Sequence, residues 1–130
     1  MRNLAAGLAF LLMAGLLAAA PAFAQTGGSE GMENMPNAVL QGLDKVTARV
    51  VTLNVPVGST VEFGSLHITA RTCRKASPVE PPESAAFLEI QEQRPDEVPE
   101  SLFSGWMFAS SPALSALENP VYDVWVIDCK

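Results

Sequence analysis

The feature that most constrains the fold is an aromatic segment near the C-terminus, residues 103–129, with the sequence FSGWMFASSPALSALENPVYDVWVIDC. It holds both tryptophans, the only tyrosine, two of the six phenylalanines and one of the two cysteines. Burying apolar surface stabilises a fold by about 25 cal/mol per Å², so the rest of a short chain is expected to pack around this segment.

The end of this segment, Val121–Cys129, is predicted to be a β-strand because β-branched and aromatic residues fill it after Pro120. Strict alternation divides its side chains between two faces, one with Val121, Asp123, Trp125, Ile127 and Cys129 and the other with Tyr122, Val124, Val126 and Asp128. Since apolar residues fall on both faces, we expect a central strand that is covered on both sides.

A strand is also predicted over residues 102–109, with Phe103 and Met107 on one side and Trp106 and Phe108 on the other.

Ser111 followed by Pro112 is typical of a helix start. Leu114 and Leu117 are three residues apart and would share one face of that helix. Pro120 is expected to end it.

Alternating apolar residues predict further strands within residues 45–55, 61–63, 66–70 and 86–90, separated by turns rich in proline and glycine. Residues 38–43 are expected to form either a short strand or a turn. Together these patterns predict a mainly β chain with five to seven strands and one short helix. The expected fold is a small single-domain sandwich or a partly open barrel over residues 38–130.

Residues 1–24 have the features of a signal peptide: Arg2, a long apolar run, and Ala22 and Ala24 at the positions that a signal peptidase recognises. Cleavage is expected between Ala24 and Gln25, which predicts a periplasmic protein. The alternative is an uncleaved membrane anchor, although the run is shorter than the ~20 residues of a typical span. Residues 25–37 lack periodicity and are expected to be a flexible tether.

The chain carries 14 acidic and 8 basic residues, a net charge of −6. An acidic surface repels nucleic acid and anionic lipid, so neither is an expected partner. No second apolar run in the sequence is long enough to predict a membrane span after signal cleavage.

Two cysteines, Cys73 and Cys129, are the minimum for a disulfide in an exported chain. A redox-active pair is the alternative, but the short C-x-x-C spacing of such pairs is missing. Strict alternation after Leu66 would place Cys73 on the polar face of its strand. A bulge or a strand end is therefore expected near Thr72.

The sequence offers few groups for catalysis, so no catalytic residue, cofactor or metal ligand is assigned. His67 is the only histidine and lies among polar strand positions. Asp123 is the most notable acid, because it shares a strand face with Trp125 and would need a partner if buried. Met32 and Met35 are a weaker alternative, as soft ligands for copper(I).

Exposed aromatic residues on strands would mark a binding surface. The candidate binding surface consists of Phe103, Trp106, Met107, Phe108, Tyr122, Asp123 and Trp125.

The chain resembles a family of secreted alphaproteobacterial proteins, the domain of unknown function number 2155. The resemblance runs from Gly42 to Cys129 through GLDKVTARV, VPVG, FGSLHITARTCRK, AAFLEI and LFSGWMFASSPALSALENPVYDVWVIDC. It implies an envelope location and pairing of Cys73 with Cys129, but no activity. Histidine is common in the family where this chain has Asn119, which argues against essential histidine chemistry at that position.

These observations predict a non-catalytic periplasmic domain that binds another envelope protein. The alternative is a periplasmic module that binds or cleaves carbohydrate, with Asp123 as its candidate acid.

Overall fold

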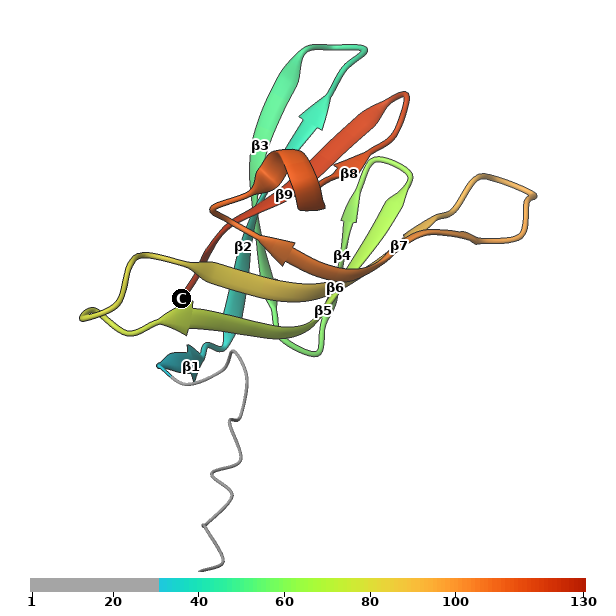
Figure 1. Ribbon diagram of the computed structural model, residues 1–130. Helices are drawn as coiled ribbons and strands as arrows, with labels where there is room; N and C mark the ends of the chain where they lie inside the picture. The colour runs from blue at the N-terminus through green and yellow to red at the C-terminus, as the bar shows by residue number, and fades with distance from the viewer. Residues whose placement is uncertain (1–30) are drawn as a thin grey trace, which may run out of the picture.

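The computed structural model describes residues 31–130, which form two antiparallel β-sheets packed face to face (Figure 1). Sheet I has the order β1-β5-β6-β7, and β4 pairs with β5 beside β1. Its strands are β1 (Met32–Asn34), β4 (Thr60–Phe63), β5 (Leu66–Ala76), β6 (Ser84–Glu92) and β7 (Glu100–Phe108). Sheet II has the order β3-β2-β9-β8, with strands β2 (Asn37–Asp44), β3 (Arg49–Pro56), β8 (Leu117–Glu118) and β9 (Tyr122–Cys129).

The predicted mainly β, sandwich-like fold is confirmed, but the described residues form nine strands instead of five to seven. The excess comes from β1 and β8, which are three and two residues long and too short to give a periodic pattern. The predicted signal peptide lies outside the described residues. The tether prediction needs correction from residue 31 onward, because Met32 pairs with Ala76 and the Met35 N–H donates to the Cys73 carbonyl at 2.8 Å.

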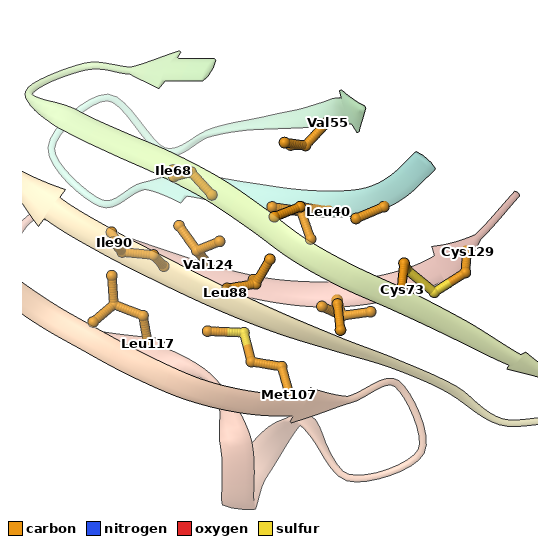
Figure 2. Packing of buried hydrophobic residues seen from close by; sticks show 14 of the residues in the cluster. Leu40, Val55, Ile68, Cys73, Leu88, Ile90, Met107, Leu117, Val124 and Cys129 are labelled. Atoms are coloured by element: carbon orange, nitrogen blue, oxygen red, sulfur yellow. A yellow bond between two sulfur atoms is a disulfide. The ribbon is translucent and has the colours of Figure 1, made fainter. Parts of the chain in front are cut away.

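The core lies between the two sheets, where alternate residues of each central strand point inward (Figure 2). Leu66, Ile68 and Ala70 are fully buried, which confirms the inward face predicted for β5. The other large buried side chains are Leu40, Val55, Leu88, Ile90, Met107, Val124 and Val126. Since both sheets contribute to one cluster, the two layers form a single hydrophobic unit.

Two β-bulges turn the cysteines toward this core. In β5 the pairing with β6 shifts between Ala70 and Thr72, which makes Arg71 an extra residue and brings Cys73 to the inner face. This confirms the bulge predicted near Thr72. In β9 the pairing with β2 skips Ile127, so that Cys129 shares the inner face with Val126 instead of the face predicted by strict alternation.

Cys73 and Cys129 form a disulfide between the two sheets, with their Cα atoms 5.8 Å apart. That separation lies inside the normal range for a bridge. The bond therefore joins β5 of sheet I to β9 of sheet II at one end of the sandwich (Figure 2).

β9 is central in sheet II, between β2 and β8, as predicted. Its outer face is not covered, however: Trp125 is half-buried and Ile127 is 39% exposed. Only two residues of β8 pair with β9, because the chain has just entered sheet II from the other layer.

The helix α1 (Pro112–Ser115) is one turn long and has no buried residue. The predicted helical face is wrong, because Leu114 is 89% exposed while Leu117 is buried in β8 opposite Val124. Ser115 donates its hydroxyl to the Ser111 carbonyl at 3.0 Å, and the chain is extended from Ala116 onward. Burial of Leu117 in the sheet replaces the helical contact with Leu114.

Replacing both Cys73 and Cys129 by alanine is expected to lower the free energy of unfolding by about 4 kcal/mol, because the bridge closes a loop of about 57 residues. Urea unfolding followed by tryptophan fluorescence measures this change. The wild-type protein under reducing conditions should match the double variant. Equal urea midpoints for oxidised wild type and variant would contradict a stabilising role.

Candidate binding surface

The structure divides the seven predicted surface residues among three places. Phe103, Met107 and Tyr122 point toward the core, and Met107 is only 1% exposed. Tyr122 packs edge-to-face on Phe63, with ring centroids 5.1 Å apart. These three residues therefore belong to the interior or its rim, and Met107 is removed from the candidate surface.

Asp123 and Trp125 lie on the outer face of sheet II, opposite Leu43 and Gln41 of β2. Lys45 Nζ is 2.7 Å from Asp123 Oδ1, and both side chains are partly exposed. The candidate acid is thus an ion-paired, partly exposed carboxylate at the start of β9, and the oxygen that faces Lys45 is itself buried.

Trp106 and Phe108 lie on the outer face of sheet I and are 40% and 41% exposed. Trp106 stands opposite Phe87 of β6, with ring centroids 5.6 Å apart and the planes at 83°. We call Phe87, Trp106 and Phe108 the aromatic patch. Phe87 was not predicted to lie on the surface, although in the sequence it shares one side of the alternation with the polar residues Glu89 and Gln91 of β6.

A polar groove of about 280 Å³ lies on the same outer face of sheet I. It is lined by Thr60, His67, Thr69, Arg71, Glu89, Gln91 and Gln93. Arg71 donates through Nε and Nη2 to Glu89 Oε2 at 3.1 and 2.9 Å, and this carboxylate raises the pKa of the guanidinium. His67 is a half-exposed groove residue 3.9 Å from Glu62, as predicted for a surface histidine.

A larger cleft of about 560 Å³ lies at the disulfide end of the sandwich, beneath the turn from β5 to β6. Its polar groups bind one another: Lys75 Nζ lies 3.0 Å from Asp128 Oδ1, and the Ser84 hydroxyl donates to the same oxygen at 3.3 Å. Burial alone would raise the pKa of Asp128. The bonds from Lys75, the Cys129 N–H and Ser84 outweigh it, so the pKa lies below its usual range.

Asn119 is the centre of a polar network at the opposite end of the sandwich. Its side-chain oxygen accepts the N–H groups of Val121 and Tyr122 at 2.9 and 3.4 Å, an arrangement that shapes the turn into β9. Its amide group donates to the buried Glu92 at 3.4 Å, and its carbonyl accepts a bond from Lys45 at 2.9 Å. The residue at this position therefore has a structural role in this chain.

Residues 31–130 contain no group of three or more His, Cys, Asp and Glu side chains placed to hold a metal ion. Met32 lies in β1, and Met35, in the connection between β1 and β2, packs against the core. No helix in the described part of the chain is long and apolar enough to cross a membrane.

Residues 38–129 match a protein family described as an uncharacterized protein conserved in bacteria, DUF2155. The matched region contains the sandwich except β1 and the first residue of β2, and it includes both cysteines, the aromatic patch and the polar groove. The chain belongs to this family, as the resemblance of its sequence predicted.

A relative in Rickettsia prowazekii (strain Madrid E), described as an uncharacterized protein, is 32% identical over 101 residues. The alignment covers 78% of this chain and 65% of the relative, so the chain spans about two thirds of the relative's length. No solved structure matches the chain.

Replacing Asp128 by asparagine is expected to lower the free energy of unfolding at pH 7 by about 1 kcal/mol or less, since the carboxylate is partly exposed. The pKa is lower in the folded state, so the stabilisation is present above the ordinary pKa near 3.8 and is lost as the pH falls below it. Urea midpoints at pH 7 and near pH 3 test this.

Asp96→Asn, in an exposed turn, is the matched control and should leave both midpoints unchanged. An Asp128→Asn deficit of the same size at both pH values would show that the ion pair with Lys75 is not its cause.

Proposed function

We propose that this protein is a non-catalytic interaction domain of the bacterial envelope, exported to the periplasm, which binds another envelope protein through the aromatic patch. The observation that carries the proposal is the exposure of Trp106 and Phe108 to water on one strand, beside Phe87. Tryptophan and other aromatic residues are enriched where protein partners bury the centre of an interface.

The rigidity of the sandwich supports this proposal. The strand that carries Trp106 pairs with β6 along its length, and β6 pairs with the disulfide-bonded strand β5. The edge-to-face contact with Phe87 restricts the indole further. A partner would therefore lose little conformational entropy in ordering the patch when it binds.

The ion pairs support a role without catalysis. Asp123, the acid that the sequence pointed to, is paired with Lys45, and the groove carboxylate Glu89 is held by Arg71. Asp123 and Glu89 are therefore each engaged in an ion pair with a neighbouring cation.

Trp106→Ala is expected to reduce recovery of a crosslinked envelope partner at least tenfold, because removing a central aromatic anchor typically costs more than about 1.4 kcal/mol. The measurement is crosslinking in intact cells, followed by mass spectrometry of the tagged protein. Trp125→Ala, which truncates the tryptophan on the outer face of sheet II, is the control. Equal loss with both variants, or retention with both, would count against the patch.

A second candidate function, carbohydrate binding, is favoured by the polar groove. Planar groups such as those of Arg71, Glu89 and Gln91 suit pairs of sugar hydroxyls, and Trp106 lies nearby on the same face. The 83° angle between Phe87 and Trp106 leaves no flat two-ring platform, and for this reason we rank the function second.

Carbohydrate binding predicts that soluble cell-wall glycan fragments shift the tryptophan fluorescence of the wild type and that Arg71→Ala abolishes the shift. Arg49→Ala, a similar change on exposed β3, should retain it. An unchanged wild-type spectrum with every fragment would rule out this candidate.

A further inference from the structure

We propose that β7 pairs with β7 of a second copy of this chain, antiparallel and about a two-fold axis at Gly105. This inference goes beyond the proposed function, because it concerns the backbone edge of β7 and not the aromatic side chains. Within the described residues β7 is the last strand of sheet I, and β6 is its one strand neighbour (Figure 1).

Hydrogen bonds at the end of β7 show which residues face away from β6. The Phe108 N–H donates to Ser115 Oγ at 3.0 Å and its carbonyl accepts the Ser111 N–H at 3.1 Å, so Phe108 points outward. The next residue, Ala109, donates its N–H to the Ser84 carbonyl at 2.8 Å. Because antiparallel pairs alternate, the N–H and C=O groups of Trp106 and Ser104 also face the open edge.

The open edge is self-complementary. A two-fold axis at Gly105 places Ser104 of each copy opposite Trp106 of the other, and the four outward backbone groups of each copy meet four from its partner. The exposed side chain of Ser104 is small and leaves room for the partner's indole. The turn at Ser111 already occupies the backbone of Phe108, so the ladder is short and centred on Gly105.

The other strand edges in the described residues are short or end in proline. β1, β4 and β8 are three, four and two residues long, while β3 begins at exposed Arg49 and ends at Pro56. Short strands, charged side chains and proline are usual means of protecting an edge. β7 is nine residues long, and its pairing with β6 shifts only near its start, between Ser101 and Phe103. Residues 101–117, by contrast, contain no charged residue and no proline before Pro112.

Charge also favours a second copy meeting at this segment. Each chain has a net charge of −6, and residues 101–117 are an uncharged stretch where two acidic copies approach with least repulsion. Salt screens the remaining repulsion, since the Debye length falls from about 30 Å at 0.01 M to about 8 Å at 0.15 M. Self-association through β7 should therefore strengthen with salt, whereas binding of a basic partner weakens.

The test is sedimentation equilibrium of the protein produced from its full-length chain, at 0.02 and 0.5 M NaCl. The expected result is a dimer of the purified protein whose dissociation constant falls severalfold at the higher salt. Ser104→Pro removes one outward N–H at an edge position and is expected to abolish the dimer.

Thr52→Pro is the matched control. The Asn37 N–H bonds Lys130 of the β9 side, so by alternation Gln41 also faces β9 and its partner Thr52 faces the open edge of β3. This variant should dimerise as the wild type does.

Ser104→Glu is a second test, because it brings two carboxylates close across the axis while leaving an exposed position of the monomer unstrained.

A monomer at both salt concentrations, or a dimer that survives both Ser104 variants, would overturn the proposal. So would pairing of the β7 edge with residues 1–30 of the same chain, seen as a monomer whose Ser104 and Trp106 amides are protected from hydrogen exchange. Partner capture that is lost in Trp106→Ala but kept in Ser104→Pro would leave the proposed function standing without the dimer. A Ser104→Pro variant that loses the dimer but keeps the partner confirms the pairing of β7 with β7.

Discussion

The structure depends on the covalent bond between its two sheets. Cys73 and Cys129 reach each other only because each strand carries one extra residue, Arg71 in β5 and Ile127 in β9. The same irregularity in β5 that turns Cys73 inward also turns Arg71 outward, where it binds Glu89 in the polar groove. The bulge at Arg71 thus positions both the disulfide and a residue of the polar groove. A change that removes the bulge would therefore disturb both.

The two ends of the sandwich are closed by polar networks in place of apolar side chains. Lys75 and Asp128 meet beyond the disulfide, while Asn119 joins Lys45 and Glu92 at the other end. These networks satisfy charged groups near the core, which is the condition for tolerating them there. The aromatic patch differs from these networks, because it is an exposed apolar feature with no evident role in folding.

The sequence predicted those parts of the fold that depend on local periodicity. The inward face of β5 and the two sides of β7 followed from alternation, and the bulge near Thr72 followed from a conflict between that alternation and a bridge at Cys73. The side of β7 that faces the core depends on the partner sheet, so Met107 was assigned to the surface wrongly. The bulge at Ile127 was not predicted, because the alternation of side chains in β9 does not conflict with any other feature of the sequence.

The two proposals for β7 use different atoms of the same residues and are compatible. Pairing through the backbone of Ser104 and Trp106 leaves the side chains on the outer face of a sheet that now continues across two copies. A two-fold axis at Gly105 brings the two aromatic patches side by side, so a partner with two matching sites would bind the pair far more tightly than one copy. A weak dimer held by a short ladder could in this way control binding, because only the paired state presents both patches at once.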